Sequence, residues 1–77
     1  MEELTVGQQL VGANFNPSQR SDVERIKQLY AEIIDLLNAT FQDQEVSDTK
    51  EAFLEAATLH IITAQMWSVK AITYDYW

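Results

Sequence analysis

The stretch EAFLEAATLHIITAQMWSVKAIT, residues 51–73, constrains the fold most, because it predicts one long helix that has no polar face. At about 100° per residue, polar side chains such as Glu55, His60 and Lys70 point in all directions, with apolar side chains between them. A helix that is apolar all round is normally buried on every side. The polar interruptions exclude a membrane span, which needs an apolar run of about 18 or more residues. Since one partner helix covers only one side, we expect other copies of the protein to cover the rest.

Length and composition support this expectation. A chain of 77 residues buries a marginal core and usually needs disulfides, a metal or oligomerisation. There is no cysteine, and the single histidine cannot build a zinc site alone. The net charge of −7 argues against long nucleic acid and anionic membranes as partners, although a few local cations can still hold a small anion. The acidic N-terminus lacks the apolar run of a signal peptide.

Residues 16–42 predict the first helix of a hairpin. Asn16 suits the N-cap, Pro17 suits the first helical position, and Gln19 can complete a capping box. Apolar side chains then gather on one side of this helix and polar ones on the other. The apolar set is Val23, Ile26, Leu29, Tyr30, Ile33, Ile34, Leu36, Leu37 and Phe41. We therefore expect this helix to form the outer layer and residues 51–73 the inner layer.

A polar turn, residues 42–48, leads to the second helix, which Ser47 or Asp48 can cap. Two helices with a short connection pack as an antiparallel hairpin. The sequence thus predicts an all-α fold: a two-helix antiparallel hairpin over residues 16–77, assembled into a helical homo-oligomer. The aromatic tail, residues 74–77, is expected to be a frayed end whose rings dock on a neighbouring chain.

Residues 1–15 form an N-terminal arm that precedes the hairpin. Its two glycines and alternating apolar residues indicate irregular structure, with a short helical turn near residues 6–10. The arm is either a disordered tail or an ordered segment on the surface of the oligomer, where Leu10 and Phe15 are apolar enough to dock.

Lys27 is the most informative charge, because it lies at the border of the apolar side of the first helix. It either pairs with Glu24 or a neighbouring chain, or joins symmetry-related copies around a shared anion such as a phosphate. Arg20 and Asn16 lie where the helix is expected to start, which attracts anions, although Arg20 can simply be solvated beside Asp22. Phe15 can pack against the helix start or stack on a nucleobase.

The second helix offers weaker candidates. His60 is expected to be a hydrogen-bonded core residue, and Met66 and Trp67 are expected in the core. Thr58 and Thr63 can bond back to the helix backbone or line a cavity. No nucleophile–histidine–carboxylate set, phosphate-binding loop or metal-ligand spacing is present, so we expect no catalysis, no metal and no cofactor.

Two groups of motifs resemble a known family, the small phage anti-CBASS sponge proteins, which share a helical-hairpin domain with one class of phage anti-Thoeris sponges. The resemblance covers residues 11–73. The motifs are FNPS at 15–18, Val23, IK at 26–27, AEIID at 31–35, and MWSVKA at 66–71. Many members have Gly-Asn where this chain has Gln19-Arg20.

The resemblance implies a non-enzymatic protein, typically a hexamer, that holds cyclic oligonucleotide second messengers between protomers in the cytoplasm of the infected bacterium. Sequestration starves an immune effector of its activator. The phosphate-contacting lysine of the family matches Lys27, and Phe15 is the nearest counterpart of its base-stacking aromatic residue. Some members bind cyclic trinucleotides in a second pocket on the second helix, where Thr58 is the candidate.

Two other functions remain open at this point. The hairpin can be a structural or adaptor oligomer without a small-molecule ligand, in which case loss of Lys27 is tolerated. A metal-dependent enzyme built from carboxylates would need Glu32 and Asp35 together with another chain.

Overall fold

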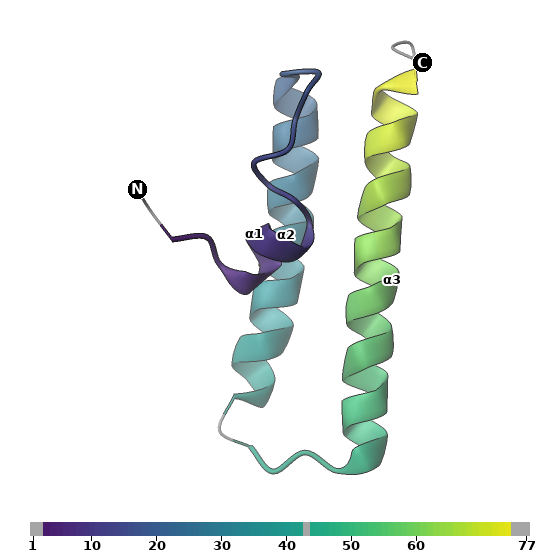
Figure 1. The fold of residues 1–77 in the computed structure, drawn as a ribbon. Helices are drawn as coiled ribbons and strands as arrows, with labels where there is room; N and C mark the ends of the chain where they lie inside the picture. Colours follow the sequence, from purple (N-terminus) through teal and green to yellow (C-terminus); the bar gives the residue numbers. More distant parts are fainter. Residues whose placement is uncertain (1–2, 43, 75–77) are drawn as a thin grey trace.

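The computed structural model describes residues 3–42 and 44–74 and confirms an all-helical hairpin. Three helices follow one another: α1 (Val6–Leu10), α2 (Ser21–Phe41) and α3 (Asp48–Ile72). Figure 1 shows α2 and α3 side by side and antiparallel, with α1 and the rest of the arm lying across α2. No helix in the described part of the chain is long and apolar enough to cross a membrane.

The second helix of the predicted hairpin is α3, and it begins and ends close to the predicted positions. Its N-cap is Ser47, whose hydroxyl accepts a hydrogen bond from the Lys50 backbone N–H at 3.2 Å. Of the two capping residues that the sequence offered, the structure uses Ser47. Tyr74 follows the helix and is exposed, and the rest of the predicted aromatic tail lies outside the described residues.

The first helix of the predicted hairpin is α2, and its predicted start at Asn16 is wrong. Residues 16–19 instead form a turn in which the Gln19 N–H donates to the Asn16 carbonyl, and Gln19 has a φ of 56°. That left-handed backbone cannot continue into a right-handed helix, so α2 begins only after Arg20, its N-cap. The Asn16 side chain is bound elsewhere: it accepts from the Ser18 hydroxyl and donates to the Arg20 carbonyl.

The arm is ordered, and it docks on α2 of its own chain. Thr5 caps α1 through a capping box with Gln8. Gly7 is buried against α2, where a Cβ atom would collide with the carbonyl oxygen of Ala31. Val11 enters the core, whereas Phe15, expected to dock, is 71% exposed. The arm therefore packs on α2 through a close backbone approach at Gly7 and through the buried Val11 side chain.

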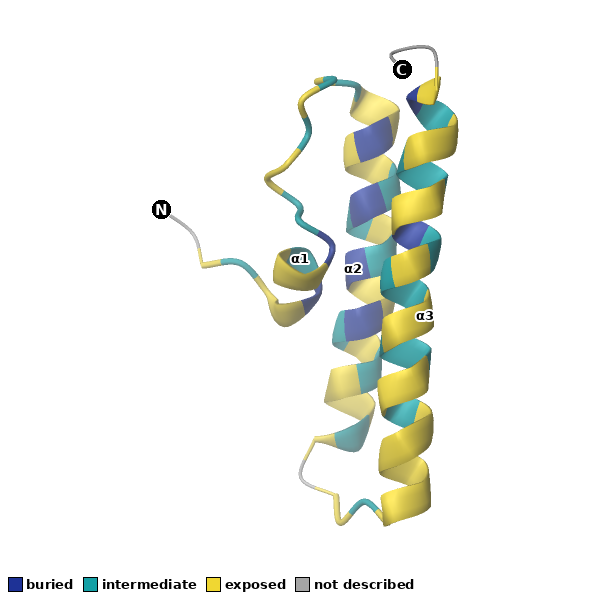
Figure 2. Ribbon diagram, turned by 45° about the vertical axis from the view of Figure 1, so that its right-hand side comes forward, coloured by how far each residue is buried: buried dark blue, intermediate teal, exposed yellow. Residues whose placement is uncertain are grey.

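A single chain buries very little. The core consists of Val11, Ala31 and Ile34, with Val23 buried nearby. The Cα atoms span only 45 × 28 × 12 Å, so most of the α3 circumference is not covered by the described residues. Figure 2 shows α3 largely exposed along its length. Large apolar side chains on this helix lie open: Phe53, Leu59, Met66 and Trp67.

His60 is also exposed in a single chain, so its expected place in a core depends on the assembly as well. The inner position of α3 is a property of an assembly, and a single chain does not test it.

Replacing Gln19 by glycine is expected to raise the free energy of unfolding by about 1 kcal/mol. Left-handed backbone costs a residue with a Cβ atom about 1–2 kcal/mol, and glycine avoids this cost. Part of the stabilisation is offset, because glycine makes the unfolded chain more flexible. Denaturant unfolding at one fixed protein concentration measures the change. Gln42→Gly is the matched control, since Gln42 is an exposed loop glutamine with a φ of −64°. Equal stability of the two variants would contradict the explanation.

Candidate functional site

Lys27 is a buried cation without a buried anion. Its side chain, on α2, is 5% exposed, and its Nζ donates hydrogen bonds to the backbone carbonyls of Gly12, at 2.9 Å, and Phe15. Among the described residues no carboxylate lies within ion-pair distance of it, so the expected pairing with Glu24 is absent. Two carbonyl dipoles of the arm compensate for part of the cost of burying this charge.

The backbone of the arm is shaped for these two contacts. Gly12 has a φ of 64°, which glycine adopts without strain. The Phe15 N–H donates to the Gly12 carbonyl at 2.8 Å, closing a tight turn. This turn brings both carbonyl groups to the same ammonium.

The ammonium can bind one more acceptor. A lysine carries three N–H donors, and the described residues engage two of them. Burial lowers the pKa of Lys27 below its ordinary value, because the charged form has lost water. An anion at the third donor would restore the lost stabilisation of the charge, so the position favours a negatively charged ligand.

An exposed aromatic ring accompanies the cation. The centre of the Phe15 ring lies 5.5 Å from Lys27 Nζ, within the range of a cation–π contact. Both residues line two open hollows between α3 and the arm, of about 450 and 660 Å³. Lys27 and Phe15 therefore form a wall shared by two hollows.

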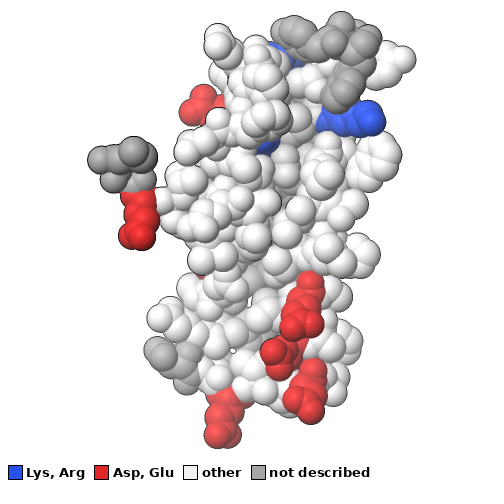
Figure 3. Space-filling model, in the orientation of Figure 1, with Lys and Arg blue, Asp and Glu red and all other residues white. Residues whose placement is uncertain are grey.

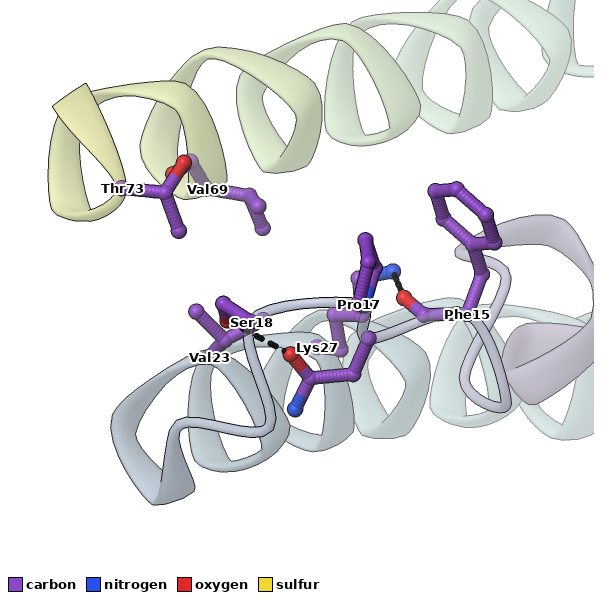
Figure 4. Close-up of a pocket in the computed structure, with 8 residues that line it drawn as sticks. Phe15, Pro17, Ser18, Val23, Lys27, Val69 and Thr73 are labelled. Carbon is purple, nitrogen blue, oxygen red and sulfur yellow. Dashed lines mark hydrogen bonds between the residues drawn. The ribbon is translucent and has the colours of Figure 1, made fainter. Parts of the chain in front are cut away.

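The smaller hollow lies at the open end of the hairpin, between the start of α2 and the end of α3 (Figure 4). Its other lining residues are Asn16, Pro17, Ser18, Val23, Val69 and Thr73. The larger hollow lies between α1 and α3. It is lined in addition by Gln9, Leu10, Val11, Gly12, Ile62, Thr63, Gln65, Met66, Trp67, Val69 and Lys70.

The structure brings together three of the five predicted ligand-binding residues: Lys27, Phe15 and Asn16. Thr58 lines neither hollow, and its hydroxyl donates to the Leu54 carbonyl of its own helix at 2.9 Å. The proposed ligand contact of Thr58 stays a prediction.

Arg20 lies apart from both hollows and connects the two helices. Its guanidinium makes two hydrogen bonds to the Asp22 carboxylate and a third, at 2.9 Å, to the Ile72 carbonyl at the end of α3. This arginine lowers the pKa of Asp22. Arg20 does lie beside Asp22, as expected, but its guanidinium is bonded rather than simply solvated. A ligand contact of Arg20 stays a prediction.

Sequence reasoning missed two residues of the larger hollow. Trp67, expected in the core, is 66% exposed, and Lys70 places its Nζ 5.7 Å from the centre of the Trp67 ring. Their spacing of three residues puts both on one face of a helix, which was a signal available in the sequence. Together with Phe15 and Lys27, they give the larger hollow a second aromatic ring and a second cation.

Charge is unevenly distributed along the hairpin. Figure 3 shows lysine and arginine at the end where α3 terminates, and a concentration of acidic side chains near the connection between α2 and α3. Asp48, Glu51 and Glu55 belong to the first turns of α3 at that acidic end. The hollows thus lie toward the end of α3 that is opposite these acidic residues.

Carboxylates and histidine do not assemble into a metal site within the described residues. Asp35, considered as a possible cation ligand with Glu32, accepts a hydrogen bond from the Gly7 N–H at 2.7 Å. Its structural role is therefore to hold the arm.

Comparison with known proteins identifies a family. The sequence model of the family described as Acb2/Tad1, hairpin domain, matches residues 8–73, which begin inside the arm and include α2 and α3. Neither the curated proteins nor the solved structures give a match. The chain belongs to the Acb2/Tad1 hairpin-domain family, and this membership indicates a sponge-type anti-defence role.

Proposed function

We propose that this protein is a phage anti-immune sponge that binds cyclic dinucleotides and sequesters them without cleavage in the cytoplasm of the infected host. The observation that carries the proposal is the Lys27 ammonium, which is buried beside the exposed Phe15 ring and which, within residues 3–42 and 44–74, has two carbonyl groups as hydrogen-bond acceptors. Membership of the family supports the sponge role at the coarser level.

The two groups suit the two chemical parts of such a ligand. An ammonium with a remaining donor pairs with a phosphate, and a hydrogen bond between charged groups contributes about 1.5–3 kcal/mol. An exposed phenyl ring stacks on a base, which is worth about 1–3 kcal/mol. Both hollows fall within the range of about 300–1,000 Å³ that is usual for ligand pockets, which supports a small ligand over a flat macromolecular partner.

We propose further that the complete site lies between protomers of a homo-oligomer, most simply a hexamer built from dimers. A two-fold symmetric dinucleotide suits a two-fold site, because each half of the ligand then meets the same residues. The exposed apolar side chains of α3 supply the surface that such an assembly would bury. Cyclic trinucleotides are a second ligand class to be tested, with Thr58 as the candidate contact.

Lys27→Gln is expected to weaken binding of cyclic dinucleotides by roughly 100-fold or more, because a two-fold site loses two charged hydrogen bonds of about 1.5–3 kcal/mol each. Isothermal titration with cyclic dinucleotides of different base composition measures the affinity, and sedimentation velocity checks that the assembly is intact. Lys50→Gln is the control, because it removes the same charge from an exposed residue at the start of α3. Equal affinities of the two variants would place the ligand elsewhere, and a wild type that binds none of the ligands would favour the adaptor function.

The ligand is expected to leave the protein chemically unchanged. Cyclic dinucleotide incubated with the protein and released by heat denaturation should elute intact in ion-exchange chromatography. The control is the same ligand heated without protein. Linear dinucleotide or mononucleotide products that appear only with protein would reject the sponge function.

Trp67→Asp is expected to dissociate the assembly. In a single chain Trp67 is 66% exposed, so a charge there costs little unless another chain covers it. Sedimentation velocity at low micromolar concentration measures the effect. Thr49→Asp, which adds the same charge in the first turn of α3, should leave the sedimentation coefficient unchanged. A wild type that sediments as a folded monomer would overturn the proposed assembly.

A further inference from the structure

The arm is fixed to α2 at a point well away from the Lys27 ammonium. Gly7 is buried there. Its N–H has no partner within α1, because it lies in the first turn, and it donates to Asp35 Oδ1 at 2.7 Å. The side chains of Gln8 and Gln28 add a second hydrogen bond between arm and helix, at 3.2 Å. Among the described residues, Asp35 is the only one whose carboxylate accepts a hydrogen bond from this arm.

Hydrogen bonds within the arm connect this anchor to the two carbonyls that hold Lys27. The Val11 N–H donates to the Gly7 carbonyl at 3.0 Å, and the Ala13 N–H donates to the Gln8 carbonyl at 2.9 Å. The turn from Gly12 to Phe15 follows directly. The segment from the anchor to Phe15 thus folds back on itself, so its position on α2 sets the position of both carbonyls.

From these contacts we propose that Asp35 is a positioning residue of the anion site: by accepting the Gly7 N–H, it holds the arm so that the Gly12 and Phe15 carbonyls keep the Lys27 ammonium in place. This inference rests on the proposed function, because it assigns a second residue to the same site. An acidic side chain would then assist the binding of an anion.

Direct repulsion of the ligand by Asp35 does not oppose this role. Asp35 lies eight residues after Lys27 on α2, or about 12 Å along the helix axis. An anion in contact with the Lys27 ammonium is much closer to that cation than to Asp35, so attraction by Lys27 outweighs repulsion by Asp35. In addition, Oδ1 of the Asp35 carboxylate is already occupied by the hydrogen bond from the Gly7 N–H.

Three variants separate positioning from charge. Asp35→Ala removes both the acceptor and the charge, whereas Asp35→Asn removes the charge and keeps an acceptor oxygen. Gly7→Ala displaces the arm from the other side of the contact without a change in charge, because its Cβ atom would collide with the Ala31 carbonyl. Circular dichroism and sedimentation velocity verify that each variant is folded and assembled.

We expect Asp35→Ala and Gly7→Ala to weaken cyclic dinucleotide binding by about tenfold or more, since apparent affinity falls in proportion to the fraction of molecules with a docked arm. Asp35→Asn should stay within about threefold of the wild type, because it retains the acceptor. The ligand is the member of the cyclic dinucleotide panel that the wild type binds most tightly.

The titration of Lys27 gives a second measurement, which needs no ligand. Selectively ¹⁵N-labelled lysine resolves Nζ of Lys27, Lys50 and Lys70, and the Lys27→Gln variant assigns the first. Burial keeps the pKa of Lys27 low in the wild type, and it should return toward the ordinary value in Asp35→Ala and Gly7→Ala but not in Asp35→Asn. Few other titratable groups lie near Lys27. The arm from residue 6 to 15 contains no titratable side chain, α3 contributes Lys70 to the larger hollow, and Glu24 on α2 is exposed.

Wild-type affinity in Asp35→Ala and Gly7→Ala, with an unchanged Lys27 titration, would overturn the inference. A wild type that binds no member of the panel would overturn the proposed function instead. The Lys27 titration in the three variants would still decide whether Asp35 positions the ammonium.

Discussion

The burial of one ammonium group against two backbone carbonyls organises the functional half of this molecule. Removing a charge from water is costly, and dipoles compensate for it only in part. The contact with the Gly12 and Phe15 carbonyls joins the arm to α2. It lies beside the hollow that α3 completes. A site of this kind is poised for an anion, because an anion supplies the compensation that the carbonyls do not.

Much of the fold could be predicted from the sequence, because helix periodicity and turn chemistry are local properties. The pattern of apolar residues on α2 and the Ser47 cap of α3 are read from neighbouring residues. The start of α2 was mispredicted because two competing hydrogen bonds, one from Ser18 to Asn16 and one from Asn16 to the Arg20 carbonyl, replace the expected cap. Gln19 occupies a left-handed position that glycine favours, and Arg20 occupies an N-cap position that asparagine favours, so neither residue signals its own conformation.

The candidate site was predicted less completely than the fold. Lys27, Phe15 and Asn16 do come together, and their grouping follows from family motifs that lie close in sequence. The carbonyl partners of Lys27 could not be predicted, since they depend on how a glycine-containing arm folds back across a helix. Trp67 was assigned to the core and Lys70 was given no role in a site, because a helix with apolar residues all round does not reveal which side faces a hollow.

The hydrogen bond from Arg20 to the Ile72 carbonyl closes the hairpin at the end opposite its connecting turn. The buried residues of α2 lie between Val23 and Ile34, toward this closure, whereas residues 35–41, toward the turn, are exposed or half-buried. Local stability therefore varies along the hairpin, and partial opening begins at the connecting turn. Amide hydrogen exchange of a single chain should be slowest around the site and fastest toward the turn, so thermal fluctuations at one end leave the ligand-binding end intact.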